Sequence, residues 1–292
     1  MLNRTYRYDS SRDALFLPHL AHGFFPGKEN LPDDLLCAEC ALLAYKRFES
    51  DPAEAKEAQD TLASVGFTES EAFDRSGSQA FAAWNPLTQT AVVSFRGTEQ
   101  DPTDLGTDLK AVLVAWDQGG RVHAGFTAYW EDLAAGTNML QWIADHKGRL
   151  LLTGHSLGAA LSTLAASYWI SRGRTAKLVT IGSPRVGDST FVATLPASKI
   201  EVSRYVDCCD IVTRLPPPEL GFLHVRDEAP LYIDRLGELH AGATQDFVGD
   251  DREKARKEYI VAEAWRKHSV PLRDLADHAP INYVYALRHQ VP

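Results

Sequence analysis

A change of hydrophobic period at Gly154–Gly158 constrains the fold of this 292-residue chain more than any other feature. The residues before it, Leu150–Thr153, are continuous and mostly apolar, as in a parallel strand that is covered on both faces. From about Ser156 to Ser171, apolar and small residues recur at helical spacing. A strand that turns sharply into a helix leaves the turn residue strained at the carboxyl edge of a sheet. The pattern therefore predicts an α/β protein with a functional side chain at this turn.

The residues of this turn read Gly-His-Ser-Leu-Gly, which makes Ser156 the candidate nucleophile. The two glycines add no side-chain bulk where the strand and the helix meet. A serine hydroxyl is a poor nucleophile at neutral pH unless a neighbouring base takes its proton. The chain must therefore supply a base and an oxyanion site from other segments. The alternative interpretation is a helix start whose glycines serve only a tight turn.

Strands and helices alternate along the rest of the chain. Further strands are expected at 79–84, 90–96, 177–181 and 200–206, and further helices at 32–48, 52–64, 126–146 and 250–267. This alternation predicts a mostly parallel central sheet with helices on both faces, in which ligands bind beyond the carboxyl ends of the strands. We expect residues 1–292 to form a single domain with a helical insertion at about 236–270.

Charge and hydropathy limit the partners and the location. The net charge of -9 and the absence of a basic stripe argue against nucleic acid. Residues 1–20 contain no apolar signal region, and no stretch of the sequence is long and apolar enough to cross a bilayer. These observations predict a cytoplasmic protein, or a secreted one if a signal has been removed. Contact with a membrane or lipid interface is expected to be at most peripheral.

The cysteines occur as a Cys37-x-x-Cys40 pair and as adjacent Cys208 and Cys209. One such pair lacks the second half of a metal cage, so we predict no metal. Buried free thiols are the expected state of all four cysteines. A disulfide between the two pairs is the alternative.

The segment Ser94–Thr98 ends an expected strand with the residues Ser-Phe-Arg-Gly-Thr. In hydrolases with a nucleophile turn, one oxyanion donor is the N–H after the nucleophile, which here belongs to Leu157. The second donor comes from the loop after an earlier strand, and Thr98 stands at that place. A plain strand-ending turn is the alternative, although it gives no reason for the polar residue beside Gly97.

Together these segments resemble the class 3 lipases, a family that includes fungal triacylglycerol lipases and feruloyl esterases. The resemblance implies an α/β-hydrolase fold. The resembling segments follow the order of the family and are Ser94–Thr98, Val122–Phe126, Thr153–Ala159, Gly182–Asp188, Asp210–Pro217 and Gly221–His224.

The resemblance also implies the other members of a catalytic triad. The family's acid precedes a Val-x-x-Leu-Pro stretch, which here points to Asp210, with Asp207 as the nearest rival. The family's histidine lies near the carboxyl terminus before a tyrosine, which points to His278, with His268 and His289 as rivals. The chain order of serine, aspartate and histidine is that of α/β-hydrolases.

Two other histidines, His155 beside the nucleophile and His123 upstream, are interpreted as structural. An elbow histidine of this kind is expected to pack behind the turn. Neither is expected to act as the base.

These assignments imply an enzyme that cleaves carboxylic esters of acylglycerols, or other short and medium acyl esters, through an acyl-enzyme and without a cofactor. The expected activity is that of a triacylglycerol lipase or carboxylesterase. A phospholipase or a feruloyl-type esterase is the alternative. An acyltransferase and a non-catalytic lipase-like binding protein remain as rival classes.

The family often carries a lid after the Arg-Gly-Thr segment, which corresponds here to about residues 99–116. Residues 99–109 carry four acidic side chains and no tryptophan. Because burying unpaired carboxylates is costly, such a lid gains little from entering lipid, and we expect at most weak interfacial activation. Ala111–Trp116 is strongly apolar and is either a buried strand or the hydrophobic part of a longer lid.

Overall fold

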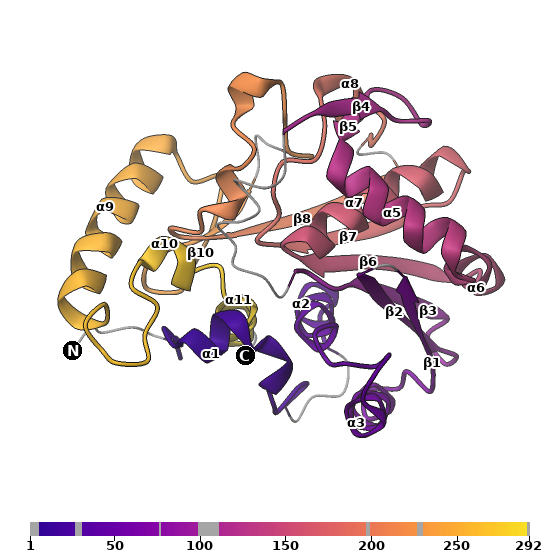
Figure 1. Ribbon diagram of the computed structural model, residues 1–292, viewed down its shortest axis with the longest axis horizontal. Helices are drawn as coiled ribbons and strands as arrows, with labels where there is room; N and C mark the ends of the chain where they lie inside the picture. The colour runs from indigo at the N-terminus through magenta and orange to yellow at the C-terminus, as the bar shows by residue number, and fades with distance from the viewer. Residues whose placement is uncertain are drawn as a thin grey trace.

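The computed structural model describes residues 6–26, 31–75, 77–98, 111–196, 199–226 and 230–290. Within these residues the main sheet has eight strands in the order β1-β2-β3-β6-β7-β8-β9-β10 (Figure 1). The central strands from β3 to β9 are parallel, whereas β1 and β2 at one edge and β10 at the other pair antiparallel. The strands are β1 Glu69–Arg75, β2 Ser78–Asn85, β3 Thr90–Phe95, β6 Arg149–His155, β7 Ala176–Ile181, β8 Ile200–Asp207, β9 Leu231–Ile233 and β10 Leu239–Ala241.

Helices cover both faces of the sheet (Figure 1). One face packs against α2 and α11, and the other packs against α5 and α7. The small residues of α7 let it approach the strands closely, because a side chain at Gly158 would collide with the backbone of Phe95. The helices are α1 Arg12–Phe16, α2 Asp33–Leu43, α3 Pro52–Ala63, α5 Ala124–Gly136, α6 Met139–Asp145, α7 Leu157–Ser171, α8 Ser189–Ala193, α9 Gln245–Ala262, α10 Arg273–Ala276 and α11 Pro280–Gln290.

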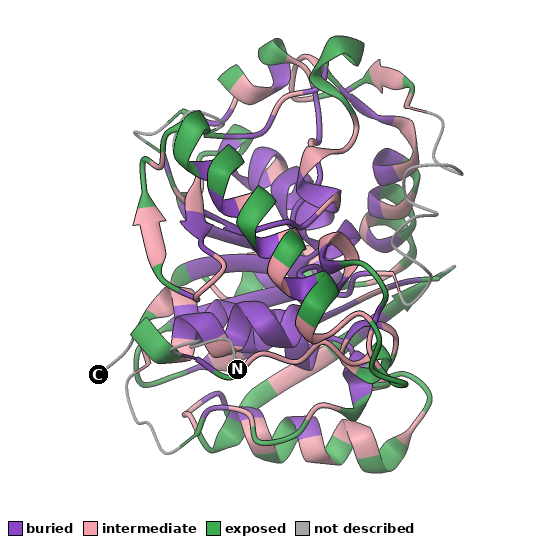
Figure 2. Cartoon of the chain, turned by 90° about the vertical axis from the view of Figure 1, so that its left-hand side faces the viewer, coloured by how far each residue is buried: buried purple, intermediate pink, exposed green. Residues whose placement is uncertain are grey.

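The core is divided by the sheet, because successive strand residues point to opposite faces. Val92 and Leu151 join the cluster beneath α2 and α11, whereas Val93 and Leu152 join the cluster beneath α5 and α7. The central strands and the inner helices are buried, while α9 presents exposed residues along its outer side (Figure 2). The fold prediction of a mostly parallel sheet with helices on both faces is therefore confirmed.

Several expected elements differ in detail. The single helix expected at 126–146 is wrong: α5 ends at Gly136 and α6 begins at Met139, because Thr137 is extended and its hydroxyl bonds to Leu133 O and Met139 N. The insertion expected at 236–270 is not wholly helical, since it begins with β10 before α9. The edge strand β1 was not expected, because its polar residues alternate around one buried side chain, Phe73.

Residues 111–116, the end of the expected lid region, contain β4 (Leu113–Ala115), which forms a hairpin with β5 (Arg121–His123). One of the two expectations for Ala111–Trp116 was a buried strand: a strand is present, but β4 is only partly buried and Val112 is 48% exposed. Only the end of the segment is firmly packed, where buried Trp116 donates from Nε1 to Ser167 Oγ at 3.0 Å. Residues 99–110 of the expected lid lie outside the described residues.

All four cysteines are buried free thiols, as expected. Cys37 and Cys40 lie on α2, and Cys208 and Cys209 follow β8. Among the described helices, none combines the length and the apolarity that a membrane span requires.

Candidate active site

Ser156 lies at the sharp turn between β6 and α7. Its backbone has φ 57° and ψ -125°, a left-handed conformation that a residue with a side chain rarely adopts. Gly154 and Gly158 make the turn possible, since a Cβ on Gly154 would lie 2.3 Å from the carbonyl carbon of Gly158. The strained turn expected from the sequence is therefore present.

The structure brings the three expected triad residues together. His278 Nε2 lies 2.9 Å from Ser156 Oγ. On the other side of the ring, His278 Nδ1 lies 2.9 Å from Asp210 Oδ2. A carboxylate only accepts, so Nδ1 carries the proton of the neutral ring and Nε2 is free to accept the proton of the serine hydroxyl. Because all three side chains are buried, these hydrogen bonds act in a medium of low dielectric.

Asp210 is held by more than the histidine. Its Oδ1 accepts the backbone N–H of Val212 at 2.8 Å, and its Oδ2 accepts the hydroxyl of Tyr283 at 2.6 Å. Burial and the neighbouring charge of Asp210 raise the pKa of Tyr283 well above its usual value, so this hydroxyl stays a donor. The tyrosine comes from α11, five residues after His278 in the chain.

Among the described residues, the hydrogen bonds of the triad join Ser156, His278 and Asp210 and include none of the rival residues. Asp207 is fully buried, and its carboxylate has no hydrogen-bond partner among the described residues. His268 is exposed beside α9, and His289 lies 4.0 Å from Glu238. His123 Nδ1 accepts the N–H of Gly125 and caps α5, which confirms its structural interpretation.

The two candidate oxyanion residues lie side by side. Strands β3 and β6 are paired in register, with Phe95 opposite Gly154, so the loop to Thr98 runs beside the turn that leads to Leu157. Leu157 begins α7, and the first N–H groups of a helix have no partner within the helix and favour negative charge. Thr98 and Leu157 line one hollow of about 560 Å³, together with Tyr129 and Leu161.

A buried cluster beside the triad offers metal-binding atoms but is already satisfied. Ligand atoms of Cys208, Cys209 and Asp277 lie within 4.8 Å of one another. The carboxylate of Asp277 accepts from Tyr8 Oη at 2.6 Å, from the N–H of Cys209 at 3.0 Å, and from Arg273 Nε at 3.0 Å. The buried guanidinium of Arg273 supplies the positive charge here, and it disfavours a further cation.

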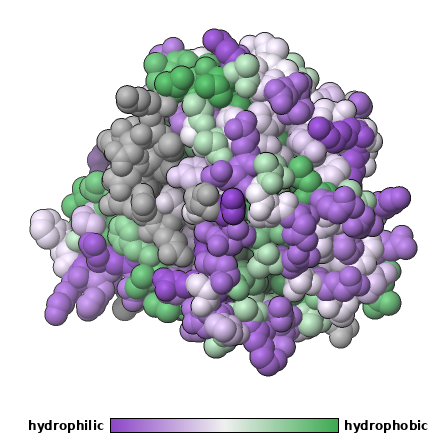
Figure 3. Space-filling model, turned by 45° about the vertical axis from the view of Figure 1, so that its right-hand side comes forward, coloured by the Kyte–Doolittle hydropathy of each residue, from purple (hydrophilic) through white to green (hydrophobic). Residues whose placement is uncertain are grey.

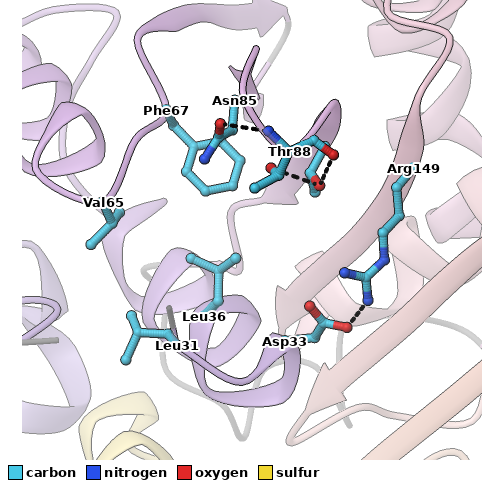
Figure 4. Close-up of a pocket in the computed structure, with 9 residues that line it drawn as sticks. Leu31, Asp33, Leu36, Val65, Phe67, Asn85, Thr88 and Arg149 are labelled. Carbon is cyan, nitrogen blue, oxygen red and sulfur yellow. Dashed lines mark hydrogen bonds and ion pairs between the residues drawn. The ribbon is translucent and has the colours of Figure 1, made fainter. Parts of the chain in front are cut away.

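A separate cavity lies at the opposite edge of the sheet (Figure 4). Phe67 and Leu36 form an apolar wall, and Arg149 reaches across to an ion pair with Asp33. Arg149 begins β6, whereas Ser156 follows its far end, so about 20 Å separates the cavity from the serine at 3.3 Å per strand residue. This cavity is therefore not part of the serine site.

Two contacts around the site were not expected from the sequence. Tyr45 Oη lies 2.7 Å from His155 Nδ1 behind the nucleophile turn. Arg96 anchors the loop before Thr98 to the chain after α2, by donating from Nε to Ala44 O at 2.7 Å. Nothing in the local pattern marks either partner, because Tyr45 and Ala44 read only as the end of an apolar helix.

A nucleophile turn at the carboxyl edge of a mainly parallel sheet, with an acid and a histidine from later strands and loops, defines the α/β-hydrolase class. Solved lipase structures share this fold. A Rhizomucor miehei lipase–propeptide complex matches 94% of this chain and 80% of its own, with a TM-score of 0.57 and 23% identity.

Residues 92–220 match the family model described as Lipase (class 3). A secreted mono- and diacylglycerol lipase of Fusarium solani is 34% identical over 161 residues, which is 53% of this chain and 47% of the relative. The phospholipase A(1) DAD1 of Arabidopsis thaliana is 38% identical over 152 residues, which is 43% of this chain and 33% of the relative. The match thus spans about half or less of these curated relatives. Residues 92–220 are therefore similar in sequence to the class 3 lipases.

Proposed function

We propose that the chain is a serine hydrolase of carboxylic esters, with acylglycerols or other short and medium acyl esters as substrates. The observation that carries the proposal is the continuous chain of hydrogen bonds from Ser156 through His278 to Asp210, with 2.9 Å at each step. A nucleophile, a base and a group that orients the base are the parts that acyl transfer requires. The similarity of residues 92–220 to the class 3 lipases supports the same activity.

In the proposed mechanism, His278 takes the proton of Ser156 as the hydroxyl oxygen attacks the ester carbonyl. Asp210 keeps the proton on Nδ1 and stabilises the imidazolium. The N–H groups of Thr98 and Leu157 receive the developing oxyanion, and His278 then protonates the leaving alcohol. Water repeats the cycle on the acyl-enzyme, which releases the acid and restores the serine.

Exposed apolar side chains at one end of the molecule support an acyl substrate. Apolar atoms gather near the top of the face in Figure 3, the end of the molecule at which Figure 1 places β4 and β5. Val112 is 48% exposed there, and Leu220, whose neighbour Gly221 faces Leu113, is 52% exposed. Exposed apolar side chains of this kind suit a hydrocarbon chain. Phospholipase A1 activity is the second candidate function, because one relative is the phospholipase A(1) DAD1 of Arabidopsis thaliana.

The name of the Fusarium relative supports the secreted alternative for the location of this protein. We further propose that residues 1–292 form one domain, because segments from both ends of the described chain pack on the same sheet.

The test is hydrolysis of p-nitrophenyl acetate, butyrate, octanoate and palmitate by the full chain and by Ser156→Ala. We expect the variant to lose about ten-thousandfold in kcat, with the fold intact by circular dichroism. Ser162→Ala is the matched control, because Ser162 is a buried serine of the same helix that bonds only locally, to Ala159 O. Retention of most of the activity in Ser156→Ala would show that another residue is the nucleophile.

A further inference from the structure

The residues at the end of α2 contact both the oxyanion loop and the turn that carries the nucleophile. On the oxyanion side, Arg96 donates from Nε to Ala44 O at 2.7 Å and from Nη2 to Lys46 O at 2.5 Å, and it pairs with Glu49. Between these two carbonyl groups lies Tyr45, which is 1% exposed and points to the nucleophile turn through its bond to His155. One short segment therefore fixes the loop that leads to Thr98 and also reaches the turn that carries the serine.

The second link connects His155 to the base. His155 Nε2 lies 2.8 Å from the backbone carbonyl oxygen of His278. A carbonyl only accepts, so Nε2 must carry a proton in this contact. Tyr45 Oη lies 2.7 Å from Nδ1 of the same ring, where it donates to the unprotonated nitrogen. The three groups form a relay from the hydroxyl, through one imidazole, to the backbone of the other.

His155 stays neutral while it does this. Burial, and then the neighbouring His278, lower the pKa of His155 well below its usual value. The centroids of the two rings are 4.5 Å apart, so a charge on His155 would repel the imidazolium that forms on His278. A neutral imidazole has only one N–H, and its direction depends on the partner of the other nitrogen.

We propose that Tyr45 is a positioning residue, whose hydroxyl selects the Nε2–H form of His155 and thereby holds His278 within reach of Ser156. In the opposite form, the Nε2 lone pair of His155 would face the carbonyl oxygen of His278 and repel it. This inference rests on the proposed function, because it gives Tyr45 a role only if His278 is the base.

The packing around Tyr45 ties the relay to the oxyanion loop. A Cβ added at Gly97 would lie 2.1 Å from Tyr45 Oη and 2.7 Å from the backbone oxygen of His155. The loop therefore lies directly against the tyrosine hydroxyl, and only glycine fits at position 97. A displacement of Tyr45 would therefore shift both the loop that carries the oxyanion donors and the base.

The test compares Tyr45→Phe with the full wild-type chain on p-nitrophenyl butyrate. We expect kcat to fall about five- to tenfold, as for the loss of one neutral hydrogen bond, with KM unchanged. Tyr259→Phe is the matched control, because it removes a buried hydroxyl that bonds to Val270 O at 2.7 Å away from the site. The control is expected to keep the wild-type kcat.

A second variant isolates the choice between the two ring forms. In His155→Gln, the amide nitrogen takes the place of Nε2 and donates without needing Tyr45. We expect this variant to stay within a few fold of wild type, and Tyr45→Phe to change its kcat by less than about twofold. The ¹⁵N shifts of the imidazole nitrogens supply a readout apart from activity: His155 should be the Nε2–H form in wild type and a mixture in Tyr45→Phe.

Two results would overturn the role of Tyr45. One is a kcat for Tyr45→Phe equal to that of Tyr259→Phe, and the other is an unchanged His155 signal in Tyr45→Phe. Should His155→Gln fail to fold, the ¹⁵N shifts of the single variant still decide. The failure of the proposed function is distinguishable, since it would appear as an active Ser156→Ala.

Discussion

Asp207 and Asp210 lie close together at the end of β8 and are both fully buried, but their carboxylates have different surroundings. Asp210 accepts from a backbone N–H, a tyrosine and the catalytic histidine candidate. Asp207 has no hydrogen-bond partner among the described residues, and burial, followed by the charge of Asp277, raises its pKa well above the usual value. Hydrogen-bond donors surround the carboxylate of Asp210, whereas the surroundings of Asp207 favour its neutral form.

Asp207→Asn should therefore stabilise the protein, and more so at higher pH. Because the folded state raises the pKa of Asp207, the unfolded chain binds fewer protons above about pH 4, and stability falls as pH rises toward the folded-state pKa. Each unit of raised pKa corresponds to about 1.4 kcal/mol. We expect the free energy of unfolding in urea to rise by about 1 kcal/mol or more at pH 8, and to change little near pH 4.

Asp34→Asn is the control with the opposite sign. Burial raises the pKa of Asp34, but hydrogen bonds from Lys177 and Tyr205 outweigh it and lower the pKa overall. Its contribution to stability is therefore present above the unfolded-state pKa and lost as pH falls. This variant should be less stable than wild type at pH 8 and nearly equal to it in acid. The same pH trend in both variants would refute the assignment for Asp207.

At the residue scale, the sequence predicts the site residues that belong to local motifs. The strand–turn–helix pattern and the resemblance identify Ser156, Asp210 and His278, which meet in space. Tyr45 could not be found in this way, because its partner His155 lies 110 positions further on and its own surroundings read as core. Contacts across the fold, made by residues with no motif, are visible only in the structure.

At the scale of helices and strands, buried elements were predicted well and polar edges were not. The strands β3, β6, β7 and β8 are mostly buried, and each was expected from the sequence. The edge strand β1 has the exposure of a surface loop, and the strands β9 and β10 are only three residues long. Pairing with a neighbour, rather than local preference, defines such short strands.

The close packing of α7 on β3 predicts that alanine has opposite effects on stability at a buried glycine of α7 and at an exposed glycine of α9. Gly158→Ala should lower the free energy of unfolding by about 2 kcal/mol or more, because the new Cβ would lie 2.0 Å from Phe95 O. Gly249 lies on the exposed side of α9, with no atom within 4 Å of an added Cβ. Gly249→Ala should raise the free energy of unfolding by about 0.5 to 1 kcal/mol.

Thermal and urea unfolding of the two variants measure this pair. Loss of stability in both would mean that glycine is needed in α9 for another reason. Gain in both would mean that α7 can move away from the sheet without cost.

At the scale of the whole molecule, the N-terminal segment around Asp9 is hydrogen-bonded to the segment that carries His278. Asn282 is fully buried, accepts the N–H of Asp9 at 2.8 Å, and donates to Asp9 O at 2.9 Å and to Ala276 O at 3.1 Å. Tyr8 adds its hydrogen bond to Asp277. Residues more than 260 positions apart in the chain thus hold the base in place.

Asn282→Ala should lower the free energy of unfolding by about 2 to 4 kcal/mol, because the partly buried N–H and carbonyl of Asp9 lose their partner and the carbonyl of Ala276 keeps only its bond from the N–H of Ala279. Limited proteolysis should then cut first in the segment around Asp9. Asn138→Ala is the control, since the exposed side chain of Asn138 bonds to Glu71 at the surface, and it should change stability by less than about 0.5 kcal/mol. Equal resistance of Asn282→Ala and wild type to protease would show that the hydrogen bonds of Asn282 are not needed to hold this segment in place.

The buried cysteines have a consequence for how the folded molecule opens. Burial raises the pKa of the Cys37, Cys40 and Cys208 thiols, so they stay protonated and unreactive while the core is closed. Cys37 and Cys40 lie beneath the sheet on α2, whereas Cys208 lies near the segment that carries the base. Each of these two regions therefore contains thiols that can react with a labelling reagent only when that region opens. The rate of thiol labelling in the native protein reports the opening of each region separately.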